Sequence, residues 1–195
     1  MTLTKPQQDR RERMLHVATR LAVEGGFDAV QMRAVANEAE VALGTLYRYF
    51  PSKEHLLVSA LRQQIQALEQ RLAVRPAVGG DEAARVIDVL TRANRALQRQ
   101  HRFAVAVIRS LAAGDETVAP VVREVRDLMG GIIVAAIDPS GSTDGRSLGV
   151  RERLVAEVLE EVWLSSLVAW IGGVDGQASV DRKLADATML MLGPR

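Results

Sequence analysis

The chain has 195 residues, a formal net charge of +1, 48% hydrophobic residues and 25% charged residues. This length fits one large domain or two small ones, and the composition excludes a wholly disordered protein. The sequence contains no cysteine, which excludes disulfides, cysteine nucleophiles and thiolate metal sites. The nearly neutral charge neither demands nor excludes a nucleic-acid partner.

The chain also lacks the patterns of export and membrane insertion. Its first 13 residues are polar and charged, unlike a signal peptide. No uninterrupted apolar run approaches the ~20 residues that a membrane-spanning helix needs. We therefore expect a cytoplasmic protein with no membrane partner.

The first part of the chain predicts three helices. Residues 7–24 carry apolar side chains at helical spacing, and Gly25 and Gly26 then stop the helix. Two short helices are expected over 32–39 and 43–50, joined by a tight turn. Pro51 ends the second of them, because proline disfavours helical geometry in the preceding residue.

The remainder of the chain is also expected to be helical. Ser52 suits the N-cap of a helix from 53 to about 74, and Asp81 suits the cap of the next. We expect the further helices over 81–100, 103–113, 120–137, 150–171 and 180–192. Residues 138–149 are rich in Gly, Ser, Asp and Pro and predict a loop. No strand-type alternation is evident, so the fold class is all-α with about nine helices.

Two short helices across a tight turn form a helix-turn-helix, although the pattern alone is weak. The run V-A-L-G-T-L-Y-R-Y-F-P-S-K-E-H-L-L at residues 41–57 resembles the tetracycline-repressor (TetR) family, as does Gly25-Gly26-Phe27 before it. The resemblance covers residues 10–60. It implies a ligand-responsive transcriptional regulator with an N-terminal three-helix DNA-binding domain (residues 1–52). An effector-binding and dimerisation domain (residues 53–195) would follow, connected by the helix from 53 to about 74.

The third helix would lie in the major groove of DNA. Leu46 and Phe50 share one face and should pack inward, whereas Gly44, Thr45 and Arg48 should point outward with Tyr49. Gly44 allows close approach to DNA, Thr45 can bind a phosphate or meet a thymine methyl, and Arg48 can read guanine or grip a phosphate. The alternative for Arg48 is a solvated charge.

Other residues would hold the DNA backbone. Tyr47 and Tyr49 can donate hydroxyls to phosphates, or serve only as packing aromatics. Lys53 begins a helix whose amides could share a phosphate with its ammonium group. The resemblance adds Gln31 and Arg33 at the start of the second helix. Ala42 departs from the family pattern, since many relatives carry Ser or Thr there and it cannot cap a helix.

The resemblance implies an inverted-repeat DNA operator, a homodimer and a small effector. The two reading helices of a dimer would lie ~34–36 Å apart, or a multiple of that. The dimer candidates are apolar or small residues of the last two helices: Val155, Leu159, Val162, Ser166, Leu184, Ala187 and Met191. The alternative is that they only fill the core of one subunit.

The effector pocket is expected to be apolar, because its candidate helices are poor in charge. The candidates are Phe103, Val107, Leu111, Leu128, Ile132, Trp163 and Leu167. Core packing is the alternative for each. The stretches N-R-A-L-Q-R (94–99) and V-W-L-S-S-L-V-A-W (162–170) resemble actinobacterial members of the family that repress cholesterol catabolism. That resemblance implies control of steroid or lipid degradation, with a sterol-derived acyl-coenzyme A as inducer. Residues 100–144 match less well.

No enzyme pattern has a supporting context. Gly145-Arg-Ser147-Leu-Gly149 fits the G-x-S-x-G nucleophile motif, which needs a preceding strand. His16, His55 and His101 have no metal-binding spacing, and the adjacent Glu160 and Glu161 point in different directions on a helix. We expect no catalytic residue, metal or cofactor. A DNA-binding protein without a ligand and an all-α enzyme stay as alternatives.

Overall fold

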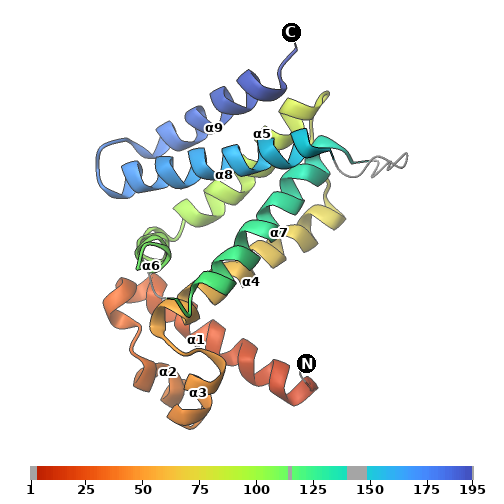
Figure 1. Cartoon of the computed structure of the whole chain (residues 1–195). Helices are drawn as coiled ribbons and strands as arrows, with labels where there is room; N and C mark the ends of the chain where they lie inside the picture. Colours follow the sequence, from red (N-terminus) through yellow and green to blue (C-terminus); the bar gives the residue numbers. More distant parts are fainter. Residues whose placement is uncertain (1–3, 114–115, 140–148, 195) are drawn as a thin grey trace. The chain divides into compact units, whose positions relative to one another are not determined.

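The computed structural model describes residues 4–113, 116–139 and 149–194, and the regular structure within these ranges is helical (Figure 1). The nine helices in this part of the chain are α1 (Lys5–Ala29), α2 (Met32–Glu38), α3 (Leu43–Tyr49), α4 (Lys53–Val74), α5 (Glu82–Gln98), α6 (His101–Leu111), α7 (Ala119–Ile137), α8 (Val150–Ile171) and α9 (Gln177–Leu192). The predicted all-α class is confirmed, and most helix ends fall within three residues of expectation.

The largest departure lies at the end of α1, which continues to Ala29. The two glycines do interrupt the helix, because Gly26 has φ 72° and ψ −160°, a conformation that is essentially restricted to glycine. A further helical turn follows this kink. The chain thus changes direction at Gly26 before it enters α2.

Two predicted helix caps are present. The hydroxyl of Ser52 accepts a hydrogen bond from the backbone N–H of His55 at 3.1 Å, at the start of α4. The carboxylate of Asp81 accepts from the N–H of Ala84 at 2.7 Å, at the start of α5. Both bonds satisfy N–H groups that the first helical turn leaves without a partner.

The helices divide into two units. The first unit contains the described residues up to Gln64 together with those of Gln100–Val125. Within it α6 packs along α1, and α2 packs against α3 and α1. Its core includes the fully buried side chains of Met14, Leu15, Leu46, Phe50 and Phe103.

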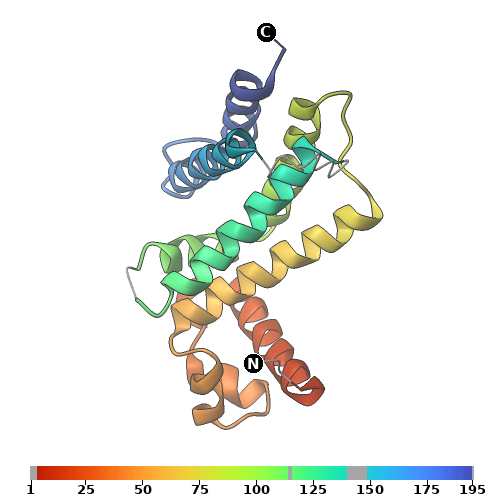
Figure 2. The ribbon, with the colours of Figure 1, turned by 45° about the vertical axis from the view of Figure 1, so that its right-hand side comes forward.

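The second unit contains Ile65–Arg99 and the described residues from Arg126 onward. Here α9 packs against both α8 and α5, and Figures 1 and 2 show α8 and α9 side by side. Leu90, Ile133 and Leu159 are buried in its core, as is the polar side chain of Asn94. No helix in the described ranges combines the length and the apolar character needed to cross a membrane.

Candidate nucleic-acid interface and effector pocket

The corner between α2 and α3 is made by local backbone hydrogen bonds. Glu40 adopts the left-handed conformation, with φ 55°, directly after α2. The N–H of Val41 then donates to the carbonyl of Ala36 at 2.9 Å. This is the arrangement by which many helices end, although glycine usually occupies the left-handed position. The reversal allows α3 to begin at Leu43, after a turn as short as the sequence predicts.

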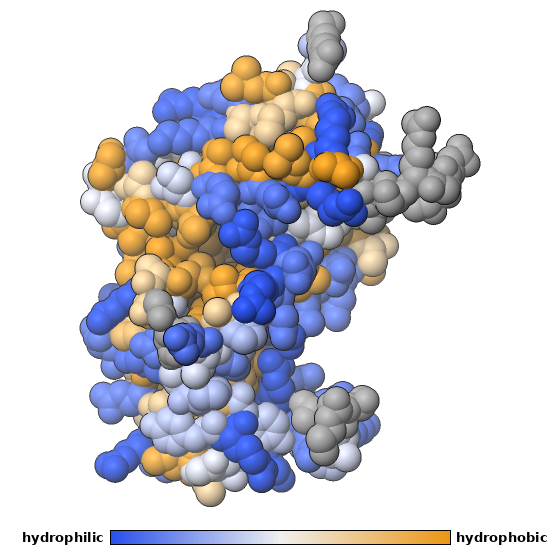
Figure 3. All heavy atoms as spheres, viewed as in Figure 1, coloured by the Kyte–Doolittle hydropathy of each residue, from blue (hydrophilic) through white to orange (hydrophobic). Residues whose placement is uncertain are grey.

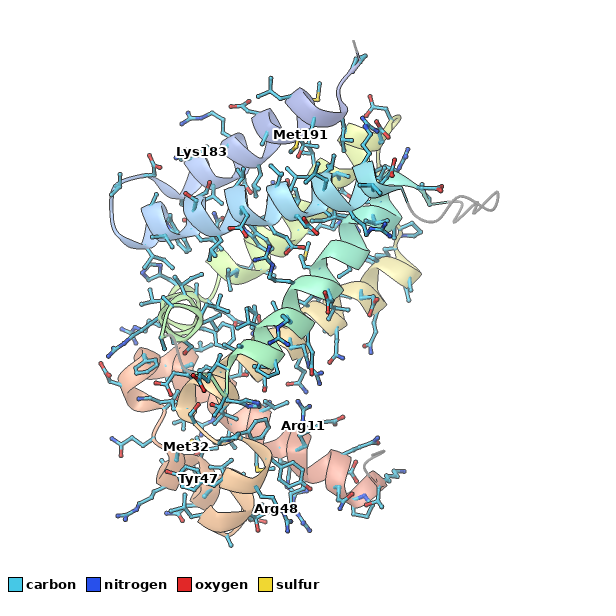
Figure 4. All side chains as sticks on the ribbon, viewed as in Figure 1. Arg11, Met32, Tyr47, Arg48, Lys183 and Met191 are labelled. Atoms are coloured by element: carbon cyan, nitrogen blue, oxygen red, sulfur yellow. The ribbon has the colours of Figure 1, made fainter. Side chains whose placement is uncertain are left out.

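The third helix has one buried face and one exposed face. Leu46 and Phe50 are fully buried, which confirms their predicted inward packing. Gly44, Tyr47 and Arg48 are exposed, with 46% of Tyr47 accessible to solvent (Figure 4). Thr45 and Tyr49 are half-buried at the border. An outward face therefore exists, but its exposed residues are Gly44, Tyr47 and Arg48 rather than the expected Gly44, Thr45, Arg48 and Tyr49.

None of the described residues requires a glycine at position 44. A Cβ atom at Gly44 would have no neighbour within 4 Å, whereas one at Gly25 would lie 2.5 Å from the Cβ of Ala29. Glycine in a helix costs about 1 kcal/mol relative to alanine. The fold thus gives no reason for this residue, while close approach of another molecule to the α3 backbone would give one.

The start of α3 lacks a side-chain cap, as the sequence implies. Ala42 is the N-cap residue, with φ −64° and ψ 141°, and its methyl group accepts no hydrogen bond. Its carbonyl accepts from the N–H groups of Thr45 at 2.8 Å and Leu46 at 3.1 Å. The backbone alone therefore starts this helix.

The two helices of the helix-turn-helix each carry an exposed arginine. Arg48 on α3 and Arg33 on α2 are exposed, and neither forms an ion pair with any residue in the described ranges. Gln31 is the N-cap residue of α2, is also exposed, and makes no capping bond with its side chain. Exposed cations and amides without an ion-pair partner on these two helices are suited to phosphate oxygens.

Lys53 has two intramolecular contacts that the sequence did not reveal. Its Nζ donates to the carbonyl of Phe27 at 3.3 Å and lies 3.8 Å from the centroid of the Phe27 ring. Arg109 of α6 places its guanidinium carbon 4.0 Å from the same centroid. Two cations therefore contact one aromatic ring, an attractive arrangement for each of them. The sequence contains Phe27 in the Gly25-Gly26-Phe27 motif but did not predict that Lys53 and Arg109 contact its ring.

Arg11 supports α3 from α1. Its guanidinium carbon lies 5.5 Å from the centroid of the buried Phe50 ring, and Figure 4 labels it. Burial, followed by the nearby Arg62, lowers the pKa of Arg11. Sequence periodicity did not single out this residue, because a half-buried arginine looks like any surface charge.

The predicted pocket residues fall in both units. Phe103 and Val107 are buried and Leu111 half-buried in the first unit, while Leu128, Ile132, Trp163 and Leu167 belong to the second. Of the latter, Ile132 lines a mainly apolar cavity of about 320 Å³ between α4, α5 and α7. We name it the α4–α7 cavity.

Trp163 takes part in a polar network within the second unit. Its indole N–H donates to the side-chain oxygen of Asn94 at 3.3 Å, and the Asn94 amide donates to Asp181 at 2.7 Å. Asn94 is fully buried, so these bonds supply the partners that a buried amide requires. The network joins α5, α8 and α9. The N-R-A-L-Q-R stretch contained Asn94, although nothing in its pattern indicated burial.

A second cavity, of about 480 Å³, lies between α7 and α8 and is lined by charged groups, including Arg126, Arg153 and Glu160. Burial raises the pKa of Glu160 to about 7, although Arg126 at 3.5 Å acts in the opposite direction. The neighbouring Glu161 is exposed and pairs with Arg126 at 2.9 Å. The two adjacent carboxylates thus differ in environment, as their positions on the helix suggest.

The predicted dimer residues are mostly buried within the chain itself. Val155, Leu159, Ser166 and Leu184 have less than a tenth of their surface exposed, and Val162, Ala187 and Met191 are half-buried. The first four therefore offer almost no side-chain surface to a partner. A different set of apolar residues is exposed on the same two helices, which we name the apolar stripe: Val150, Leu154, Val158, Leu164, Val168, Met189 and Leu190. Figure 3 shows apolar atoms gathered along α8 and α9.

The remaining patterns give no catalytic or metal centre in the described part of the chain. Residues 145–148 of the G-x-S-x-G motif lie outside the described residues. No group of three or more His, Asp or Glu residues within the described ranges could hold a metal ion. His55 instead lies beside Phe50 and Ser59.

Both halves of the chain match models of known protein families. The family model "Bacterial regulatory proteins, tetR family" matches residues 14–60, and "Tetracyclin repressor-like, C-terminal domain" matches residues 79–191. The HTH-type transcriptional repressor KstR of Mycolicibacterium smegmatis is 36% identical over 97% of this chain and 90% of its own length.

Solved structures of TetR-family regulators have a similar fold. A TetR transcriptional regulator from Rhodococcus sp. RHA1 has a TM-score of 0.84 and 29% identity, covering 96% of this chain and 97% of its own. FadR of Thermus thermophilus, solved in complex with lauroyl-CoA, has a TM-score of 0.70 and 18% identity, covering 93% and 92%. The expected resemblance is confirmed over both halves, and the chain belongs to the TetR family of bacterial transcriptional regulators.

Proposed function

We propose that the chain is a repressor that binds an inverted-repeat operator as a homodimer and is released by a hydrophobic metabolite, of the sterol-derived or fatty acyl-coenzyme A class. One observation carries the proposal: the similarity to a transcriptional repressor extends through the reading helices and the C-terminal half alike. The resemblance to repressors of cholesterol catabolism favours the sterol class. The chain acts in the cytoplasm by binding rather than catalysis.

The two parts of the chain have different roles, as the sequence predicts. Residues 1–52 contact DNA, together with Lys53 at the start of the connecting helix, and the rest of residues 53–195 holds the effector and the partner subunit. The DNA contacts are made by Gln31, Arg33, Gly44, Thr45, Tyr47, Arg48, Tyr49 and Lys53. The exposed glycine and the unpaired arginines support this assignment. Lys53 reaches a phosphate by leaving its contact with the Phe27 carbonyl.

The effector lies among the predicted apolar residues of the second unit, where Ile132 lines the α4–α7 cavity. Ile132 and Leu167 are buried and apolar, which suits a hydrophobic ligand and also suits simple core packing. The complex of lauroyl-CoA with FadR supports a thioester as effector, since that regulator shares the fold.

The homodimer forms through the apolar stripe of α8 and α9. Leu190 is 89% exposed and Leu154 is 57% exposed, so both have surface to bury against a second copy. Two such helix pairs would build a four-helix contact. A Leu154→Glu variant should sediment as a monomer in analytical ultracentrifugation. Val174→Glu, which changes an exposed valine beyond α8, should remain dimeric.

The proposed function is tested by operator binding and release. The labelled probe is an inverted-repeat duplex from the DNA that flanks the gene, followed by fluorescence anisotropy. We expect tight, salt-dependent binding and release by one acyl-CoA thioester or sterol derivative. Binding that ignores every such compound would instead identify a ligand-independent DNA-binding protein.

The reading surface is tested in the same assay. Arg48→Ala should weaken operator binding about tenfold or more, because one good arginine contact to a base is worth ~1–3 kcal/mol. Arg123→Ala, which removes an exposed cation from α7, is the matched control and should bind normally. Both variants should unfold at the temperature of the unmodified protein. Equal binding by the two variants would remove Arg48 from the reading surface.

A further inference from the structure

The second unit contains a groove with a strongly positive rim. It lies between the last turns of α4 and the second half of α5 and has a volume of about 1150 Å³. We name it the arginine groove, because five arginines line it: Arg71, Arg75, Arg92, Arg95 and Arg99. Its other lining residues are apolar, apart from Gln70, and none is acidic.

Four of the five arginines have no polar side-chain partner among the described residues. Arg92 is structural, since it pairs with Asp88 at 2.6 Å and donates to the carbonyl of Arg75 at 2.9 Å. Arg71, Arg75, Arg95 and Arg99 are exposed, and their side chains form no ion pair or hydrogen bond with any residue in the described ranges. Four like charges gathered in one groove repel one another.

The charged cavity between α7 and α8 provides a contrast. There Arg126 faces both Glu160 and Glu161, so its charge is balanced within the unit. In the arginine groove only Arg92 has such a partner among the described residues, namely Asp88. Its geometry thus favours an anion from outside the chain, and arginine is the side chain that binds phosphate groups with two parallel hydrogen bonds.

The floor of the groove narrows the class of anion. Leu68 and Leu72 lie in it, and Leu72 and Pro76 also line the apolar α4–α7 cavity. The arginines of the groove, its apolar floor and the adjoining α4–α7 cavity therefore lie next to one another along α4. A DNA backbone joins its phosphates through small sugars and has no long apolar chain to cover such a floor. A phosphorylated nucleotide joined to an apolar chain has both.

We propose that the arginine groove binds the phosphorylated nucleotide of a coenzyme A thioester, an inference that rests on the proposed effector class. The 3′-phosphate carries about −1.5 to −2 charges and, with the diphosphate, meets the four unpaired guanidinium groups. Arginine also stacks on aromatic rings such as adenine. The pantetheine arm covers Leu68 and Leu72 and directs the acyl group toward the α4–α7 cavity.

Free coenzyme A, which carries no acyl group, is the probe that tests the groove by itself. Isothermal titration calorimetry of the DNA-free protein should show binding. Dephospho-coenzyme A, which lacks the 3′-phosphate, should bind more weakly. The double variant Arg95→Gln/Arg99→Gln should bind coenzyme A roughly tenfold or more weakly, because two charge-assisted contacts are lost. Arg123→Gln is the matched control and should bind as the unmodified protein does.

The possible outcomes distinguish a failure of the groove proposal from a failure of the proposed function. Absence of coenzyme A binding, or equal binding by the double variant, would overturn the groove proposal even if an acyl-CoA releases the operator. Loss of operator binding by the double variant, without change in coenzyme A binding, would assign the groove to DNA and also overturn it. Groove-dependent binding of coenzyme A without operator release by any thioester would support the groove and contradict the proposed function.

Discussion

The reading helix α3 and the long helix α8 differ in how they separate inside from outside. In α3 the buried Leu46 and Phe50 lie on one face, and the other face carries Gly44, Tyr47 and Arg48. In α8 apolar residues occupy both faces, with Leu159 fully buried and Leu154 exposed. Helical periodicity therefore assigns function to one side of α3, whereas in α8 it cannot distinguish a core from a partner-binding surface.

The largest effect should come from the inner face of α3. Phe50→Ala should lower the free energy of unfolding by about 3–5 kcal/mol, because it empties the space of a fully buried ring. Tyr47→Ala, on the outer face, should change stability by ~0.5 kcal/mol or less and weaken operator binding. Urea unfolding monitored by circular dichroism measures the first quantity. Similar destabilisation by both variants would contradict the two-faced description of the helix.

A smaller effect is expected at Glu160, on the inner side of α8. The pKa of this carboxyl rises from about 4.5 to about 7 on folding, mainly through burial. The folded state then binds a proton more readily, so this group stabilises the protein below pH ~4.5 and the contribution is lost as pH rises through 7. Glu160→Gln removes the buried charge and should stabilise the protein at pH 8 by roughly 1–3 kcal/mol.

The matched control for Glu160 is its neighbour. Glu161→Gln changes an exposed carboxylate that pairs with the same Arg126, and exposed pairs contribute little. Unfolding in urea at pH 5 and pH 8 should therefore show a pH-dependent gain for Glu160→Gln alone. A gain of equal size at both pH values would show that the carboxyl is not titrating between them.

The sequence predicted the order of the helices, the Ser52 and Asp81 caps and the turn before α3, since these depend on local chemistry. It also singled out Gly44 and Arg48 as outward residues of α3, but it placed the half-buried Thr45 and Tyr49 with them and did not place the exposed Tyr47 there. The sequence did not predict contacts between distant segments, because no local pattern encodes them. Examples are the contacts of Lys53 with Phe27 and of Asn94 with Asp181.

The dimer residues illustrate a further limit. Val155 and Leu159 were chosen by helical spacing, and that spacing is shared by the core face and the apolar stripe. Burial depends on which neighbouring helices cover each face, and so only the folded unit reveals it. The arginine groove went unnoticed for a similar reason, because its arginines come from two helices with a loop between them.

Gly44 allows stability and DNA binding to be separated. Gly44→Ala should stabilise the protein by about 0.5–1 kcal/mol, since alanine favours the helix and its Cβ would contact nothing. If α3 approaches DNA closely, the same methyl group should weaken operator binding roughly tenfold, or ~1.4 kcal/mol. Thermal unfolding and anisotropy measure the two quantities. A stabilised variant with unchanged affinity would place Gly44 outside the interface.

The smallest effect is expected at Glu40, where the backbone rather than the side chain is under strain. Its φ of 55° lies in the left-handed region, which costs a residue with a Cβ roughly 1–2 kcal/mol. Glycine avoids this cost but loses more entropy on folding, so Glu40→Gly should stabilise the protein by about 0.5–1 kcal/mol. For a chain of this size the melting temperature should rise by ~2–4 °C per kcal/mol.

The control is Glu38→Gly, which makes the same substitution at a helical position within α2. Glu38 also pairs with Arg20, so this variant should have a lower melting temperature. If the melting temperature changed in the same direction in both variants, the left-handed backbone at Glu40 would not be a source of strain.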